Sequence, residues 1–237
     1  MMNNELLQLA VDDNTEWCTA ICESHQADIH LSKSIWINCQ PSPRYYPNII
    51  TRAPQAQAAT LKAINQFQKL NPNRNFGIKD SFGDIDLTPQ GFRCVLRGRW
   101  YGGYFSNNKQ AIIKDWQAVQ SADELALWEI AWGGNIENRI FKDTLLSDTR
   151  IKFWFVKENE NIHRGFISFH SEKCIGISNW FSNKNSVFEL SLSEDSAPIF
   201  RDLPVVFWQA DNEAINAGTA ISPLRSMRVW LAPETSR

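Results

Sequence analysis

The chain has 237 residues, 43% of them hydrophobic, and a formal net charge of −2 at pH 7. A chain of this length can bury a full core in one large domain or two small ones. The charge near zero gives no reason to expect nucleic acid or a membrane surface as a partner. No apolar run approaches the ~20 residues of a membrane helix, and the first residues show no basic segment before an apolar core. We therefore expect a cytoplasmic protein.

The five cysteines are an odd number, so they cannot all pair with one another. We expect free thiols, as in reduced compartments. Cys18, Cys22 and His25 stand near one face of a predicted helix and could contribute to a zinc site. Because no second pair of ligands accompanies them, we favour buried helix cysteines and predict no metal site.

The first 91 residues predict helices and short strands. A helix is expected to begin at Asp13, because a capping residue and an acidic turn precede apolar residues at helical spacing. The apolar stripe between Gln55 and Leu70 predicts a second helix. Short strands are expected around residues 34–37 and 49–51.

Asp80, Asp84 and Asp86 form an acidic cluster between these elements and the second half of the chain. Carboxylates in such a group could hold a cation, but their spacing does not match a calcium-binding loop. We therefore interpret the cluster as a solvated loop.

The second half begins with a predicted strand over residues 92–101. Ser121 and Glu124 then form a capping box that predicts the start of a helix. Trp128 and Trp132 are four residues apart and lie on one face of that helix. We interpret them as part of a core stripe; the alternative is an aromatic wall of a pocket for an acceptor substrate.

Three runs rich in aromatic and β-branched residues come next, at 151–156, 165–169 and 174–181. Their short connections predict antiparallel neighbours. Residues 203–208 form a near-continuous apolar run, which is typical of a strand covered on both faces. A helix at 211–217 and a strand at 227–231 complete the predicted elements, and no internal repeat is evident in the sequence.

This order of elements resembles the fold of the GNAT-type N-acetyltransferases. Several segments are also similar in sequence to a divergent bacterial subgroup of that family: Tyr45–Thr51, Asp80–Leu87, Gly176–Phe181, Leu203–Trp208 and Ile221–Leu231. The resemblance implies an α/β fold with a mixed, largely antiparallel sheet flanked by helices over residues 92–237. Residues 1–91 are then an additional N-terminal α/β half packed against it.

In this family, acetyl-CoA lies where the fourth and fifth strands part, with its phosphates at the start of the next helix. The resemblance implies that the fourth strand holds the pantetheine arm through Gly176, Ile177, Ser178 and Asn179. The family's glycine-containing phosphate loop is replaced here by a segment without glycine, in which the predicted contacts are Asn183, Lys184, Asn185 and Ser186. A side chain with a β-carbon restricts the approach of backbone to phosphate.

The resemblance implies an acyl-CoA-dependent N-acetyltransferase that moves an acetyl group to an amine of a small molecule or peptide. The usual tyrosine acid is missing from residues 211–218, and the catalytic residues are not identified. The alternative is a non-catalytic protein of the same fold that binds a ligand or a protein partner. The missing glycine loop favours the alternative, whereas the order of strands favours the enzyme.

Overall fold

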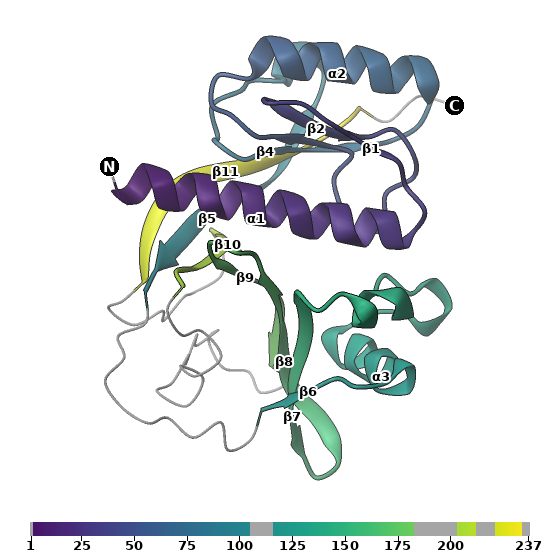
Figure 1. The fold of residues 1–237 in the computed structure, drawn as a ribbon. Coiled ribbons are helices and arrows are strands. Elements are labelled where there is room, and N and C mark those ends of the chain that lie inside the picture. The colour runs from purple at the N-terminus through teal and green to yellow at the C-terminus, as the bar shows by residue number, and fades with distance from the viewer. Residues whose placement is uncertain (1, 105–115, 183–202, 212–220, 234–237) are drawn as a thin grey trace. The chain divides into compact units, whose positions relative to one another are not determined.

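The structure is a computed structural model that describes residues 2–104, 116–182, 203–211 and 221–233 (Figure 1). Its contacts divide the chain into two compact units. Unit 1 comprises Met1–Asp13 and Trp100–Leu224, and unit 2 comprises Asn14–Arg99 and Arg225–Arg237. The chain passes from one unit to the other within a helix and within two strands. Neither unit is therefore a continuous segment such as 1–91 or 92–237.

Unit 2 is an α/β unit that contains most of the N-terminal residues. Its elements are the second part of α1 (Met2–Ser24), β1 (Ile29–Leu31), β2 (Ile35–Asn38), β3 (Ile49–Thr51), α2 (Gln57–Leu70), β4 (Gly77–Asp80), the 3₁₀ turn η1 (Thr88–Gln90) and parts of β5 (Arg93–Gly103) and β11 (Ile221–Leu231). The strand order is β1-β2-β3-β4-β11-β5. β3 and β4 are parallel, whereas β1–β2, β2–β3 and β4–β11 are antiparallel pairs.

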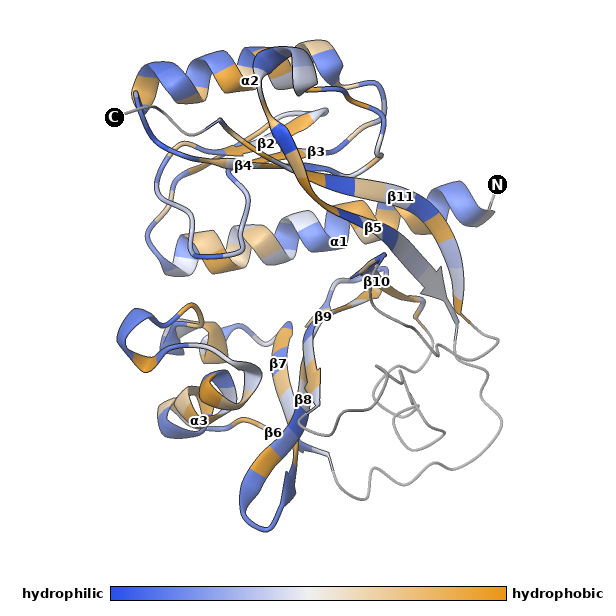
Figure 2. Ribbon diagram, turned by 180° about the vertical axis from the view of Figure 1, so that it is seen from behind, coloured by the Kyte–Doolittle hydropathy of each residue, from blue (hydrophilic) through white to orange (hydrophobic). Residues whose placement is uncertain are grey.

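The two faces of the sheet in unit 2 bury different side chains. Ile37 and Ile49 pack in the cluster under α2, whereas Trp36 and Ile50 pack against Cys18 of α1. This division results from the alternation of side chains along a strand. Figure 1 shows the two helices on opposite faces, and Figure 2 shows hydrophobic and hydrophilic residues alternating along α2. The predicted helix from Gln55 to Leu70 is thus confirmed, with a start at Gln57.

Unit 1 is built on an antiparallel meander. Its elements are the first part of α1, the end of β5, β6 (Gln117–Ala118), α3 (Ala122–Trp132), η2 (Ile136–Asn138), η3 (Asp143–Ser147), β7 (Ile151–Glu158), β8 (Asn161–His170), β9 (Ile175–Ser182), β10 (Val205–Ala210) and the start of β11. The strand order is β5-β10-β9-β8-β7-β6. The three antiparallel strands β7, β8 and β9 and the buried strand β10 are those that the sequence predicts.

The mixed, largely antiparallel sheet flanked by helices, with an additional N-terminal α/β part, confirms the predicted fold class. The N-cap of the predicted capping box is also present, since Ser121 Oγ accepts a hydrogen bond from Glu124 N at 3.2 Å, while the Glu124 carboxylate accepts from Gln120 N instead of Ser121 N. Gly133 ends α3 in the left-handed conformation with φ 98°, where glycine has no steric cost.

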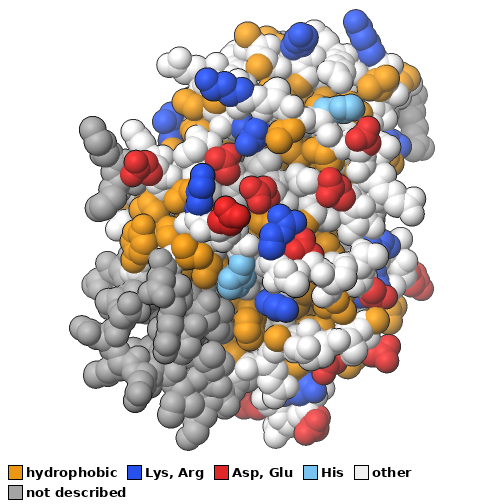
Figure 3. Space-filling model, in the orientation of Figure 1, with side chains coloured by type: hydrophobic (Ala, Val, Ile, Leu, Met, Phe, Trp, Pro, Cys, Tyr) orange, Lys and Arg blue, Asp and Glu red, His pale blue; other side chains and the backbone are white. Residues whose placement is uncertain are grey.

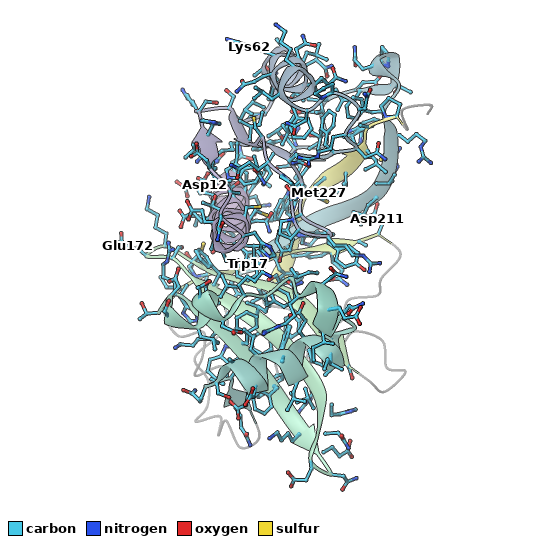
Figure 4. All side chains as sticks on the ribbon, turned by 90° about the vertical axis from the view of Figure 1, so that its right-hand side faces the viewer. Asp12, Trp17, Lys62, Glu172, Asp211 and Met227 are labelled. Carbon is cyan, nitrogen blue, oxygen red and sulfur yellow. The ribbon has the colours of Figure 1, made fainter. Side chains whose placement is uncertain are left out.

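The prediction that a helix begins at Asp13 is wrong, because α1 begins at Met2. Leu6 and Ala10 are buried and continue, toward the N-terminus, the helical spacing of Trp17 and Ile21. Asp13 is consequently an interior helix residue, and only 5% of it is exposed. In Figure 4, where α1 is seen end-on, side chains such as those of Asp12 and Trp17 project around the helix.

The two units share one order of elements. In each, a helix precedes three antiparallel strands, and the third strand is parallel to the next strand of the chain. These are α1, β1, β2, β3 and β4 in unit 2, and α3, β7, β8, β9 and β10 in unit 1. The remaining strands are exchanged: β5, which comes after β4, neighbours β10, and β11, which comes after β10, neighbours β4. The chain therefore carries a repeat of topology without a repeat of sequence.

The surface seen in Figure 3 has acidic and basic side chains interspersed rather than gathered over one element. Within the ranges that the structure describes, no helix is both long enough and apolar enough to cross a membrane.

Candidate functional site

The parallel pair of β9 and β10 lies where the resemblance predicts the ligand site. Ile175 pairs with Val205 and Gly176 with Val206, and Ile175 N donates to Pro204 O at 2.9 Å. The register between the two strands ends there, although β9 runs on to Ser182 and β10 to Ala210. On its other side β9 stays paired with β8. The second half of β9 therefore turns one edge away from its parallel neighbour.

A β-bulge lies in β9 beyond this point. Gly165 of β8 pairs with Phe181 and Ile167 with Ser178, so β9 has one more residue than β8 over this interval. Within the bulge Asn179 adopts a left-handed conformation with φ 53°. Asparagine tolerates this region better than most residues with a side chain. A bulge bends its strand and redirects backbone groups, here directly after the end of the parallel register.

Gly176 is in close contact with a buried carboxylate. A β-carbon at this position would overlap Asp13 Oδ2, so only glycine allows the carboxylate to lie against β9. Asp13 Oδ1 is also 3.7 Å from Cys174 Sγ. Sequence reasoning missed this arrangement because it assigned Asp13 to a helix start. The stripe formed by Leu6 and Ala10 was the signal that places Asp13 inside the helix.

Aromatic side chains cover one face of the sheet formed by the meander and β10. Phe166 of β8 lies 4.8 Å, between ring centroids, from Trp116 and from Trp180. Tyr101 and Phe207 stack with centroids 5.3 Å apart. Tyr101, Trp116 and Trp180 are only partly buried. This face therefore combines a packed centre with rings that remain in part open to solvent.

No family model matches the chain, and no curated protein matches it in sequence. Its structure is similar to that of a GCN5-related N-acetyltransferase from Kribbella flavida, with a TM-score of 0.60 and 8% identity over 93% of this chain and 96% of that one. A putative GNAT-family acetyltransferase from Novosphingobium aromaticivorans gives a TM-score of 0.54 and 11% identity over 88% and 92%. A functionally unknown conserved protein from Staphylococcus epidermidis gives a TM-score of 0.58 and 13% identity over 88% of this chain and 95% of that one. The chain has the GNAT fold.

β9 and β10 correspond to the fourth and fifth strands of the GNAT fold. Gly176, Ile177, Ser178 and Asn179 lie where that resemblance places the pantetheine arm, at the end of the parallel register and at the bulge. The predicted phosphate contacts Asn183, Lys184, Asn185 and Ser186 lie outside the described residues, as does most of the predicted helix 211–217. The contacts of these residues with acetyl-CoA stay a prediction.

The two tryptophans of α3 have different surroundings. Trp128 is fully buried, packs edge-on against Phe141, Phe153 and Phe181, and donates from Nε1 to Trp154 O at 2.8 Å. Trp132 is partly exposed and contacts Phe141 at 5.3 Å between centroids. The surroundings of Trp128 are those of a core residue, whereas part of Trp132 faces solvent.

A short hydrogen-bond chain lies on β7 and β8 beside the start of β9. Trp154 Nε1 donates to Ser168 Oγ at 2.9 Å, and Ser168 Oγ is 2.9 Å from His170 Nε2. Burial, with the nearby charge of Lys152, lowers the pKa of His170 below its ordinary value and favours the neutral ring. Ser168 is fully buried and is thus not accessible as a nucleophile.

The acidic cluster of unit 2 is not a solvated loop throughout. Asp80 is fully buried and accepts from the backbone N–H of Asp84 and of Ile85. Burial raises the pKa of Asp80, and these two hydrogen bonds act in the opposite direction. Asp84 Oδ2 accepts from Gln55 N at 3.0 Å. The sequence prediction was wrong for Asp80, whose carboxylate binds the backbone of its own loop, whereas Asp84 and Asp86 are exposed as expected.

All five cysteines are free, and three of them, Cys18, Cys22 and Cys174, are buried. Burial raises the pKa of Cys22 to about 12, so this thiol stays protonated at neutral pH. Over the part of the chain that the structure describes, no three His, Cys, Asp or Glu side chains are grouped as metal ligands.

Proposed function

We propose that the chain is an acyl-CoA-dependent N-acyltransferase that moves an acetyl group to an amine of a small molecule or peptide. The observation that carries this proposal is the parallel register of β9 and β10, which ends after Gly176 and Val206 in a GNAT fold. A strand edge without a neighbour offers backbone donors and acceptors that need a partner. An extended ligand with amide groups can pair with such an edge as an added strand does.

Acetyl-CoA supplies a thioester and a pantetheine arm with two amides. Ile177, Ser178 and Asn179 would pair with the arm, and a backbone N–H at this bulge would polarise the thioester carbonyl. The amine nitrogen forms its bond to the acyl carbon as the carbon–sulfur bond breaks. A carboxylate or a water molecule takes the proton that the amine loses.

The acceptor side of the proposal concerns α3. Trp132 is the partly exposed tryptophan of this helix, and we assign to it a wall of the acceptor pocket. Trp132→Ala should raise the KM for the acceptor several-fold with little loss of stability. Trp128→Ala is the matched control and should cost about 4 kcal/mol of stability, because its ring is fully buried. An unchanged KM in Trp132→Ala would contradict the assignment.

Calorimetry with acetyl-CoA, followed by an assay of CoA release with a panel of amines, tests the proposal. We expect saturable binding at one site and CoA release that depends on an amine. Absence of binding at millimolar acetyl-CoA overturns the proposal.

The alternative function is a ligand-binding or partner-binding protein that has kept the fold and lost catalysis. It is supported by the absence of glycine from residues 183–187 and of tyrosine from residues 211–218. This alternative expects acetyl-CoA to bind without CoA release for any amine, so the same two measurements separate it from the enzyme.

A further inference from the structure

Arg164 of β8 carries a buried donor for which the described part of the chain offers no partner. Its Nε is buried and has no hydrogen-bond partner among the described residues. Those residues also include no carboxylate within ion-pair distance of its guanidinium, in contrast to Arg139 and Arg150, which pair with Asp143 and Asp148. Removing a guanidinium N–H from water without a partner costs free energy. A ligand that accepts a hydrogen bond is one way to satisfy such a group.

The plane of the guanidinium is held by an aromatic ring. Arg164 Cζ lies 5.1 Å from the centre of the Trp116 ring, which in turn packs against Phe166. A cation over an indole is attracted by the ring and is restricted in orientation. The side chain is therefore ordered before any ligand binds, which reduces the entropy lost on binding.

The position of Arg164 relates it to the open part of β9. Its cross-strand partner is Ser182, the last residue of β9. Cross-strand partners place their side chains on the same face. Phe166, two residues along β8, is on this face as well, and so is Trp180, whose ring it contacts. Arg164 thus lies beside the last residue of β9, on the strand that pairs with the side of β9 opposite to β10.

The chemistry of a guanidinium selects the ligand. Its N–H groups match the oxygens of a phosphate in a bidentate geometry, and such charge-assisted bonds are among the stronger hydrogen bonds in proteins. The first half of the edge is assigned above to the pantetheine arm, so the phosphates of the same ligand lie further along it, toward Ser182. We propose that Arg164 is a phosphate-binding residue for the acyl donor, an identification of the ligand that rests on the proposed function.

The test compares three variants in calorimetric titrations with CoA, 3′-dephospho-CoA and inorganic pyrophosphate. Arg164→Gln should weaken CoA binding about 10- to 100-fold, the loss expected for one or two charge-assisted bonds. Arg164→Lys keeps the charge, so its CoA affinity should lie between those of the native chain and of Arg164→Gln. Lys157→Gln is the matched control, because Lys157 lies 5.5 Å over the Phe155 ring on the neighbouring strand, and its loss should change affinity less than about twofold. Added salt should weaken binding to the native chain more than to Arg164→Gln.

The titrations separate this inference from the proposed function. Equal CoA affinity for the native chain and Arg164→Gln overturns the inference and leaves the proposed function intact. Pyrophosphate binding that depends on Arg164, without CoA binding, supports the phosphate site and overturns the proposed function. A loss for CoA that is absent for 3′-dephospho-CoA identifies the 3′-phosphate, and equal losses identify the diphosphate. If Arg164→Gln does not fold, the inference is tested by the CoA affinity of Arg164→Lys and by the effect of salt on the native chain. A CoA affinity that changes neither with Arg164→Lys nor with salt overturns the inference.

Discussion

The parallel strand pairs β3–β4 of unit 2 and β9–β10 of unit 1 have the same topology but differ in the side chains where their pairing stops. In unit 2, β3 and β4 pair through Ile49 with Ile78 and Ile50 with Lys79. In unit 1, β9 and β10 pair through Ile175 with Val205 and Gly176 with Val206. Each register covers two residue pairs. The two pairs differ in the side chains that lie at the end of the register.

In unit 2 the chain's own side chains satisfy the end of the pair. Ser81 N donates to Thr51 Oγ1 at 2.8 Å, and Lys79 Nζ donates to Asn14 Oδ1 at 2.6 Å. Beside the start of α2, Asp84 Oδ2 accepts from Gln55 N at 3.0 Å. A carboxylate at a helix start occupies the place where an external anion could bind.

In unit 1 the corresponding end has Gly176, which is followed along β9 by the bulge at Asn179. Gly176 stands where unit 2 has Ile50, and Val206 stands where it has Lys79. The comparison teaches that one topology can end in hydrogen bonds from the chain's own side chains or in a strand edge that continues past its parallel neighbour. The side chains at the end of the parallel register decide between the two.

The closed end of unit 2 should be visible in the pH dependence of stability. Burial lowers the pKa of Lys79 to about 8 from 10.5, against the raising effect of Cys18. At Lys79 the unfolded chain binds more protons than the folded one between these two pH values, so the contribution of this residue to the free energy of unfolding rises with pH there, by roughly 1 kcal/mol per pH unit. Below pH 8 the penalty is fully present. Urea titrations of the native chain and of Lys79→Met should differ in this rise; identical slopes would contradict the buried charge.

Substitution of Gly176 in unit 1 should destabilise the protein more than substitution of Gly77 in unit 2. Gly176→Ala should lower the free energy of unfolding by about 2 kcal/mol, because the new methyl group displaces the Asp13 carboxylate. Gly77→Ala in β4 is the matched control. Its β-carbon would be 3.8 Å from Trp230 O, an ordinary contact, and its stability should change by less than about 0.5 kcal/mol. Equal losses of the free energy of unfolding for Gly176→Ala and Gly77→Ala in urea titrations would contradict this prediction.

The conformation of the bulge should affect ligand binding in unit 1. Asn179→Val should weaken acetyl-CoA binding about tenfold, because a β-branched residue is disfavoured at φ 53° by about 1–2 kcal/mol. Asn179→Gly accepts this conformation without strain and should bind as the native chain does. Calorimetry measures both variants. Equal affinities for Val and Gly would show that the bulge has no part in binding.

The carboxylate at the start of α2 should matter for stability alone. Asp84→Ala should cost about 1 kcal/mol, the usual cost of losing a hydrogen bond at a helix start. Its ion pair with Arg225 is partly exposed and adds little. Acetyl-CoA affinity should not change, since the proposed edge lies in unit 1. A shift of more than about threefold in calorimetry would place a ligand contact in unit 2.

Local patterns were sufficient for much of the fold. The stripe of α2, the capping box at Ser121 and the left-handed Gly133 each depend on residues within a few positions of one another. The runs that form β7, β8 and β9 have short connections, so their antiparallel order could be predicted as well. The resemblance then predicted Gly176 to Asn179 as contacts of the pantetheine arm.

The start of α1 and the environment of Asp80 were predicted incorrectly for a common reason. Asp13 and Asp80 carry carboxylates, which local rules assign to caps and solvated loops. Both are buried in the structure because their partners come from distant segments or from the backbone of their own loop. The bulge at Asn179 and the unpartnered Nε of Arg164 gave no signal in the sequence pattern.

By itself the sequence determined α2, the start of α3 and the antiparallel meander of β7, β8 and β9, because periodicity, caps and turns act between near neighbours. Only the tertiary structure decided which strands pair in parallel, where that pairing ends and how β5 and β11 are exchanged between the repeated orders. Asp13 and Cys174, for example, meet across 161 residues of sequence. Such contacts depend on the path of the whole chain and on the fit of side chains within a dense core, which no local pattern records.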